Sequence, residues 1–171
     1  LAGSEEVFAE RMNAKAQILG LKNSHFTNAT GWPDEEHYMT SEDLALLAEA
    51  LIRDFPQHYG YWAEPEFTYS GIRQYNRNTL VGEMGVDGLK TGHTEAAGYG
   101  VVVSGKQGDR RLISVVNGAD SKAERISESR RLINYGFKNF ETVQVAKAGQ
   151  ILASVKTWMA KKQEVLLVSY K

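Results

Sequence analysis

The sequence predicts a fold of the α+β class, because its hydrophobic pattern is helical at first, then strand-like, and then helical again. Apolar residues recur at helical spacing near both ends of the first 140 residues, whereas short runs bounded by glycine occupy much of 67–117. Toward the end of the chain the helical signal is lost and only short β-like runs remain. We therefore expect one α+β domain over 1–140 and the start of an all-β module over 141–171.

The first predicted helix covers residues 5–19. Ser4 is a favourable N-cap, and the acidic residues that follow it complement the positive end of the helix dipole. Gly20 is suited to closing the helix. Turn-forming residues are frequent over 21–39, so this segment is expected to be irregular.

Two further helices begin with sequences that resemble capping boxes. Thr40 and Asp43 form the first, with Asp in place of the commoner Glu, and Ser121 and Glu124 form the second. Gly136 is expected to end the later helix. The helical stripes consist of Leu44, Leu47, Ala48, Leu51 and Ile52 in the first and of Ile126, Leu132 and Ile133 in the second.

The strand-like part of the chain predicts a hairpin followed by three longer strands. Aromatic and polar residues alternate around a glycine over 67–75, which indicates the hairpin. Strands are expected over 86–91, 98–104 and 111–117. The glycine-containing segment 106–109 is expected to form the turn between the last two strands.

Composition excludes several classes of protein. With 20 basic and 21 acidic residues the net charge is −1, which argues against binding nucleic acid through a broad basic field. The absence of cysteine excludes disulfides and a thiol nucleophile. The four histidines show no spacing typical of metal ligands, so we expect no metal. No apolar run approaches the ~18 residues of a membrane helix.

The most informative motif is Lys90-Thr91-Gly92, which lies in one of the predicted strands. At a strand edge, the lysine offers a charge for a carboxylate or a nearby proton. The threonine offers a hydroxyl donor, and the glycine leaves room for a peptide to lie against the strand. Lys-Thr-Gly is a signature of penicillin-recognising serine acyltransferases and hydrolases, although three residues alone are weak evidence.

The surrounding sequence resembles the D-alanyl-D-alanine carboxypeptidases, which are low-molecular-mass penicillin-binding proteins. Residues 86–99 closely resemble the family segment that carries this motif, and the resemblance continues over 37–53, 67–78 and 111–140. It covers roughly residues 4–145 in all. The resemblance implies an antiparallel sheet with flanking helices, followed by the start of a β-sandwich-like second domain.

The resemblance also implies roles for the motif residues. Lys90 would set the electrostatics of the acylation step and contact the substrate carboxylate, and Thr91 would donate to that carboxylate. Gly92 would let the peptide lie along the strand, and His93 would line the site without acting as a base. One backbone N–H donor for the developing negative charge would come from the strand near His93.

Two arginines match family positions beside the motif. Arg77 resembles an arginine placed next to the active site, and Arg125 resembles the arginine that reads the terminal carboxylate of D-Ala. A guanidinium fork suits a carboxylate. For Arg125 the residues alone leave an alternative open: a solvated helix residue that pairs with Glu124 or Glu128.

One departure from the family is large. None of the eleven serines has lysine three positions later, and no Ser-x-Asn or Tyr-x-Asn sequence is present. In the family both motifs precede the segment that begins at Ser4. We therefore expect the chain to be the C-terminal part of a catalytic domain with the first strands of a second domain, and to be inactive alone because it lacks an activated nucleophile.

The implied function of the parent protein is that of a serine carboxypeptidase, which removes terminal D-Ala from peptidoglycan stem peptides without a cofactor. Its expected partners are stem peptides that end in D-Ala-D-Ala, β-lactams that trap the acyl-enzyme, and the N-terminal portion of the same enzyme. The expected location of the parent enzyme is the periplasm or the extracytoplasmic face of the bacterial inner membrane, where a C-terminal anchor would attach it to the membrane. A serine β-lactamase and a non-catalytic D-Ala-peptide binding module or fragment are the alternatives.

Overall fold

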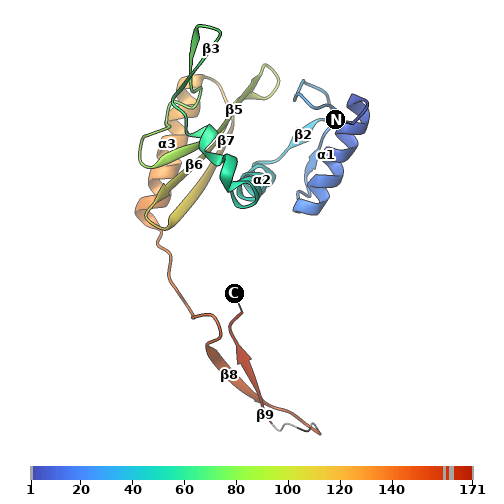
Figure 1. Ribbon diagram of the computed structural model, residues 1–171, viewed down its shortest axis with the longest axis vertical. Coiled ribbons are helices and arrows are strands. Elements are labelled where there is room, and N and C mark those ends of the chain that lie inside the picture. The colour runs from blue at the N-terminus through green and yellow to red at the C-terminus, as the bar shows by residue number, and fades with distance from the viewer. Residues whose placement is uncertain (1, 160, 162–163, 171) are drawn as a thin grey trace. The chain divides into compact units, whose positions relative to one another are not determined.

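The computed structural model describes residues 2–159, 161 and 164–170. The chain forms two compact units, Leu1–Phe140 and Glu141–Lys171 (Figure 1). In the first unit the helices are α1 (Glu5–Leu19), α2 (Ser41–Asp54), the 3₁₀ helix η1 (Pro56–Trp62) and α3 (Lys122–Asn139). Its strands are β1 (Ser24–His25), β2 (Tyr38–Met39), β3 (Glu66–Tyr69), β4 (Ile72–Tyr75), β5 (Val86–Thr94), β6 (Gly98–Gln107) and β7 (Arg110–Ala119).

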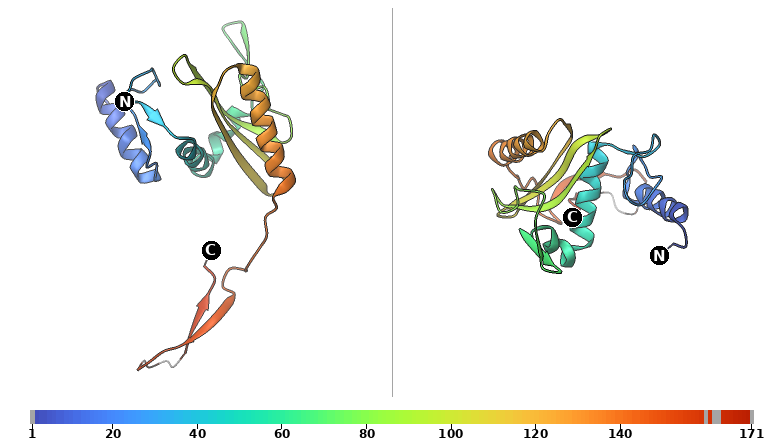
Figure 2. Two further views of the ribbon diagram at one scale, coloured as in Figure 1. Left: turned by 180° about the vertical axis from the view of Figure 1, so that it is seen from behind. Right: turned by 90° about the horizontal axis from the view of Figure 1, so that it is seen from above.

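The centre of the first unit is the antiparallel sheet β5-β6-β7, with α3 on one face and α2 on the other (Figure 2). Strand β6 supplies both layers of the core because its side chains alternate between the two faces. Val101 and Val103 pack with Ile133 of α3, whereas Val102 packs with Ala48 of α2. The predicted α+β fold, with an antiparallel sheet and flanking helices, is therefore confirmed.

The start and end of α1 agree with the sequence. The Ser4 hydroxyl accepts a hydrogen bond from the Val7 N–H, and Gly20 ends the helix in the left-handed conformation with φ of 78°. The segment between α1 and α2 is more regular than expected, since β1 and β2 pair there. Each of these strands is only two residues long, which is too short for an alternating hydrophobic pattern to predict it.

The two expected capping boxes form only in part. The hydroxyls of Thr40 and Ser121 accept from the N–H groups three residues later, as expected. The carboxylate of Asp43, however, accepts from the Asn23 N–H at 2.8 Å and the Ser24 hydroxyl at 2.6 Å, so it ties the loop to α2 instead of capping the helix. The Glu124 carboxylate reaches the N–H of Asp120 instead of that of Ser121.

Gly136 does not end α3, which continues to Asn139. A Cβ at this position would lie 2.7 Å from Cδ1 of Leu112, so the glycine allows α3 to approach the sheet closely. Glycine in a helix interior costs about 1 kcal/mol relative to alanine, and the tertiary packing overrides this local preference. The prediction of a helix end at Gly136 was wrong for that reason.

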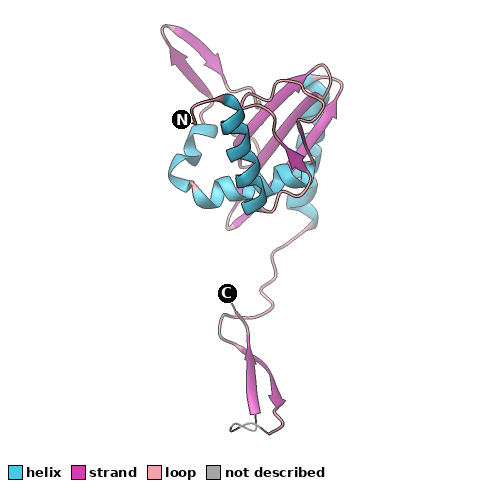
Figure 3. Ribbon diagram, turned by 90° about the vertical axis from the view of Figure 1, so that its right-hand side faces the viewer, coloured by secondary structure: helices cyan, strands magenta, loops and turns pink. Residues whose placement is uncertain are grey.

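The predicted hairpin over 67–75 is β3–β4, which projects from the first unit (Figure 3). The predicted strands after it are also present, and the first of them continues to Thr94. In the second unit β8 (Ile151–Lys156) and β9 (Glu164–Val168) form an exposed antiparallel pair. That this pair begins a β-sandwich domain stays a prediction. None of the helices in the described residues is long and apolar enough to span a membrane.

Candidate active site

A cavity of about 910 Å³ lies along β5 in the first unit. Its wall is formed by the loop before β2, by β2 itself, the start of α2, the segment before β5, the paired ends of β5 and β6, strand β7 and the start of α3. The lining residues are Thr30, Gly31, Met39, Leu44, Arg77, Lys90, Thr91, Gly92, His93, Thr94, Ala97, Gly98, Tyr99, Gly100, Asn117, Lys122 and Arg125.

The motif Lys90-Thr91-Gly92 lies on an edge strand, because β5 pairs with β6 alone among the described strands. The Lys90 side chain is exposed and its Nζ donates to the Thr91 carbonyl oxygen, while Thr91 itself is buried. Around Gly92, no described atom outside residues 91–93 lies within 4 Å of the position a Cβ would take. The strand edge is therefore open to a ligand beside the lysine.

His93 lies beside the motif and contacts Tyr99, its partner across the β5–β6 ladder. The two ring centroids are 3.8 Å apart, and the ring planes are inclined by 38°. Both residues of the pair line the cavity.

Arg125 reaches the cavity from the first turn of α3, although only 6% of the residue is exposed. Its Nη1 donates to the carbonyl oxygens of Gly92 and Gly100, both at 3.4 Å, and its Nε has no hydrogen-bond partner among the described residues. Burial lowers the pKa of the guanidinium, and the nearby Tyr99 partly opposes this effect. Arg125 is thus a buried cation with donor capacity left for an anion.

The alternative in which Arg125 pairs with a neighbouring glutamate is wrong. Glu128 pairs with Arg131 at 2.7 Å on the outer side of the helix, and Glu124 accepts from the N–H of Asp120. The sequence could not separate these cases, because Glu128 lies three positions after Arg125, a spacing that permits a pair on one side of a helix, and only packing decides which side chain faces the sheet.

Arg77 is exposed and lies between two asparagines that fix its backbone. The side chain of Asn76 donates to the carbonyl oxygens of Trp62 and Glu64, at 3.1 and 3.0 Å. Asn78 is fully buried, and its Nδ2 donates to the Gly88 carbonyl of β5 at 2.9 Å. These bonds hold the arginine against the strand that carries the motif.

The sequence analysis missed other residues of the cavity. Lys122 lies three residues before Arg125 on α3, a helical spacing that places both on one side and that could have indicated it. Asn117, Met39 and the Thr30-Gly31 loop come from distant parts of the chain, and no sequence pattern links them to the motif.

The charge of this cavity is strongly one-sided. Its described lining includes four cationic side chains, those of Arg77, Lys90, Lys122 and Arg125, and no aspartate or glutamate. The whole chain has a net charge of −1, so this concentration does not reflect composition. The cavity is suited to an anion such as a carboxylate.

The described lining contains no serine. Within the described ranges, no three His, Asp or Glu side chains are placed to hold a metal ion. The described lining of the cavity therefore offers binding groups for an anion.

Comparison with solved structures identifies the class. The chain is similar to penicillin binding protein 5 from Haemophilus influenzae, with a TM-score of 0.89 and 38% identity over 99% of this chain and 50% of that chain. It is also similar to Penicillin-Binding Protein D2 from Listeria monocytogenes in the cefotaxime-bound form, with a TM-score of 0.71 and 33% identity over 77% and 55% of the two chains. The fold is that of the penicillin-binding proteins.

Comparison of sequences identifies the family. The family model described as D-alanyl-D-alanine carboxypeptidase matches residues 1–121. The chain is 45% identical over 159 residues to D-alanyl-D-alanine carboxypeptidase DacA from Escherichia coli (strain K12), which covers 92% of this chain and 40% of that protein. The chain belongs to the peptidase family S11 of D-alanyl-D-alanine carboxypeptidases, and it spans about two fifths of the length of this curated relative.

Proposed function

We propose that this chain supplies the carboxylate-binding side of the active site in a serine-type D-alanyl-D-alanine carboxypeptidase. The observation that carries the proposal is the cavity with four cationic side chains and no carboxylate, placed along the open edge of the strand that holds Lys90-Thr91-Gly92. A peptide that ends in D-Ala-D-Ala has the matching features: a terminal carboxylate and an extended backbone that can lie against a strand edge.

In the proposed reaction the residues of the cavity have different roles. Arg125 and Thr91 bind the terminal carboxylate, and Lys90 stabilises the charge that develops during acylation. A serine attacks the carbonyl carbon of the penultimate D-Ala, the C–N bond to the terminal D-Ala breaks, and water then hydrolyses the ester. A backbone N–H near His93 is the proposed donor to the oxyanion. A β-lactam would acylate the same serine, which agrees with the cefotaxime-bound form of the relative from Listeria monocytogenes.

The nucleophile in this proposal lies outside the 171 residues, because none of the eleven serines is followed by lysine at the third position. The chain alone is therefore expected to be inactive, with the rest of the enzyme as its partner. Peptidoglycan stem peptides lie outside the cytoplasmic membrane, so we place the enzyme on that side.

An intact-mass measurement tests the proposal. The protein is isolated from its source, treated with a β-lactam, denatured and weighed. We expect the mass of the drug to be added to a polypeptide that extends beyond, or is separate from, these 171 residues. An adduct on the 171-residue chain itself, or no adduct on any polypeptide, would contradict the proposal.

A matched pair of lysine variants tests the site. Lys90→Gln should lower the rate of acylation by the β-lactam by about 10² to 10⁴, because the charge beside the reacting group is lost. Lys106→Gln removes an exposed lysine of β6 outside the cavity and should leave the rate unchanged. Equal acylation rates in the two variants would show that Lys90 has no role in the proposed site.

Binding without chemistry is the second candidate, because the cavity has anion-binding groups but no serine in its described lining. Calorimetric titration of the chain with a D-Ala-D-Ala peptide tests it. Saturable binding that Arg125→Ala abolishes would support a non-catalytic module, and the absence of binding at millimolar peptide would exclude it. Rapid release of hydrolysed penicillin by the intact protein would favour the β-lactamase alternative.

A further inference from the structure

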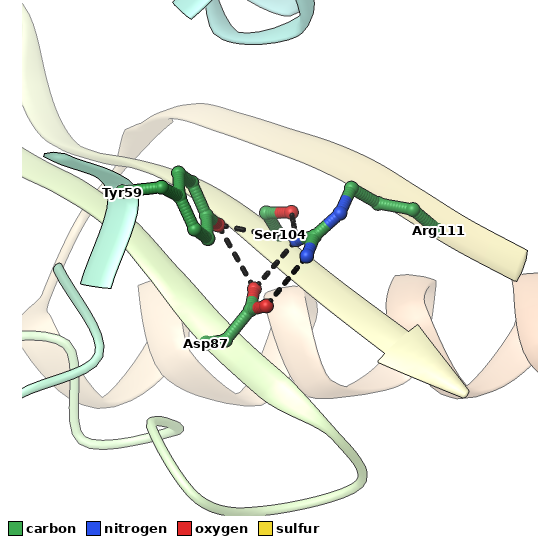
Figure 4. A network of polar contacts seen from close by, with 4 residues as sticks. All are labelled: Tyr59, Asp87, Ser104 and Arg111. Carbon is green, nitrogen blue, oxygen red and sulfur yellow. Dashed lines mark hydrogen bonds and ion pairs between the residues drawn. The ribbon is translucent and has the colours of Figure 1, made fainter. Parts of the chain in front are cut away.

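A polar network lies at the start of β5, three residues before Lys90 (Figure 4). The guanidinium of Arg111 holds both carboxylate oxygens of Asp87, with Nη1–Oδ1 and Nη2–Oδ2 distances of 2.7 Å. The hydroxyl of Tyr59 donates to Asp87 Oδ1 at 2.9 Å, and Arg111 Nη1 donates to the Ser104 hydroxyl at 2.6 Å. The four residues belong to η1, β5, β6 and β7, so the network joins four elements.

The network is shielded from solvent on most sides. The side chains of Arg111 and Asp87 are 24% and 28% exposed, and Ser104 is fully buried. The guanidinium carbon of Arg111 lies 4.9 Å from the centroid of the Tyr59 ring. Burial raises the pKa of Tyr59 to about 12, and hydrogen bonding to Asp87 raises the pKa of Arg111. Both shifts keep Tyr59 and Arg111 protonated at neutral pH.

Strand β5 needs support at this point because its ladder is interrupted there. The register with β6 shifts between Val86 and Gly88, so Asp87 has no partner residue on β6. Among the described strands β5 has no neighbour on its other side. An edge strand with a break in its single ladder is free to shift unless side chains fix it.

The contacts of Gly88 fit the same picture. Its carbonyl accepts from the buried Asn78 side chain, and a Cβ added to it would lie 2.7 Å from the hydroxyl oxygen of Tyr59. Tyr59 therefore approaches the strand as closely as a glycine permits. Together these contacts fix the backbone immediately before the Lys90-Thr91-Gly92 edge.

We propose that Asp87 is a positioning residue, which acts through Arg111, Tyr59 and Ser104 to fix the motif edge of β5 relative to the cavity. The proposed effect of Asp87 on the backbone of β5 rests only on the contacts described above. Its effect on catalysis rests on the proposed function, because only there do Lys90 and Thr91 act on a substrate. A small displacement of Lys90-Thr91-Gly92 should lower the rate of the reaction far more than it lowers the stability of the fold. The reason is that catalysis depends on the exact orientation of the groups that contact the substrate.

The first test is independent of activity. Hydrogen exchange is measured on the full-length protein that contains this chain, for peptides that cover Leu89–His93 of β5 and the middle of α3. Asp87→Asn should accelerate exchange in the β5 peptide about tenfold and leave the exchange rate of the α3 peptide within about threefold of the wild-type rate. The reason is that local opening of β5 exposes its own amides and not those of α3. Asp54→Asn is the matched control, since it removes a carboxylate from an exposed pair with Arg53. This control variant should leave the exchange rates of both peptides unchanged.

Two more variants test the connection between residues. Arg111→Gln should give the same acceleration as Asp87→Asn, and the double variant should add little, because both changes break one interaction. Tyr59→Phe removes the hydroxyl that donates to Asp87 and accepts from Arg111, but it keeps the ion pair, so it provides a milder variant should Asp87→Asn fail to fold. Unchanged exchange in β5, or equal acceleration in β5 and α3, would overturn the proposal.

The second test measures acylation by a β-lactam in the same proteins. Asp87→Asn should lower the acylation rate roughly 10- to 100-fold, and Asp54→Asn should leave it unchanged. An unchanged rate in Asp87→Asn would refute the catalytic part of the inference. A wild-type protein that is not acylated would refute the proposed function, while the exchange experiment would still decide the structural role of Asp87.

Discussion

Replacement of Arg125 by methionine should leave the fold at least as stable as before and remove recognition of a carboxylate. Methionine is unbranched and flexible and reaches about as far as the Nε of arginine, so it can fill the space that the buried stem of Arg125 occupies between α3 and the sheet. The comparison is Arg111→Met, since Arg111 is a second shielded arginine of the first unit and both of its Nη atoms have hydrogen-bond partners. The two replacements should change the free energy of unfolding in opposite directions.

The expected magnitudes follow from the contacts of each guanidinium. Arg125 has two long hydrogen bonds at 3.4 Å, a buried Nε without a partner, and no ion pair among the described residues. A buried donor without a partner costs about 1–3 kcal/mol, so methionine should stabilise the protein by up to about 2 kcal/mol. For a chain of this size, each kcal/mol raises Tm by roughly 2–4 °C.

Arg111→Met should have the opposite effect. It removes both Arg111 hydrogen bonds to the Asp87 carboxylate, which keeps only the Tyr59 hydroxyl as a donor, and it removes the Arg111 donor of the Ser104 hydroxyl. Loss of one partner from a fully buried pair costs about 3–5 kcal/mol, and because Asp87 is 28% exposed we expect about 1–3 kcal/mol.

The assay combines thermal unfolding with binding of a D-Ala-D-Ala peptide. The loss of charge-assisted hydrogen bonds worth about 1.5–3 kcal/mol should weaken peptide binding by Arg125→Met roughly 10- to 150-fold. A fall in stability of more than about 2 kcal/mol in Arg125→Met would refute this reasoning, because the arginine would then support the fold. Unchanged peptide binding would exclude Arg125 as the carboxylate ligand.

The remaining predictions concern backbone conformation and pH. Gly85→Ala should lower the free energy of unfolding by about 3 kcal/mol or more, because φ is +80° and the new Cβ would lie 2.2 Å from the Lys106 carbonyl oxygen. Gly82→Ala should lower it by only about 1 kcal/mol, because φ is +90° but the new Cβ would meet open space. Denaturant unfolding measures both changes. Burial raises the pKa of Tyr59 to about 12, so about 2–3 kcal/mol of stability should be lost between pH 10 and pH 12. Tyr59→Phe should lack this loss, whereas exposed Tyr61→Phe should follow the wild type.

Local patterns predicted most of the secondary structure. Ser4 and Gly20 bound the first helix as expected, because a cap and a left-handed glycine act over a few neighbouring residues. Gly136 was misread as a helix end because its close contact with Leu112 lies 24 positions away in the sequence. Asp43 was misread as the returning half of a capping box for the same kind of reason, since its partners Asn23 and Ser24 lie on another segment.

The sequence by itself determined the α+β class, the family and the motif strand, because these depend on residue order and short spacing. It also placed Lys90, Thr91, Gly92, His93, Arg77 and Arg125 as candidates, and the structure brings all six to one cavity. Only the tertiary structure decided that Arg125 turns into the sheet without a carboxylate partner and that Asp87 is tied to Arg111. Those facts depend on which side chains the packing of α3, η1 and the sheet brings together, and distance along the chain carries no record of such contacts.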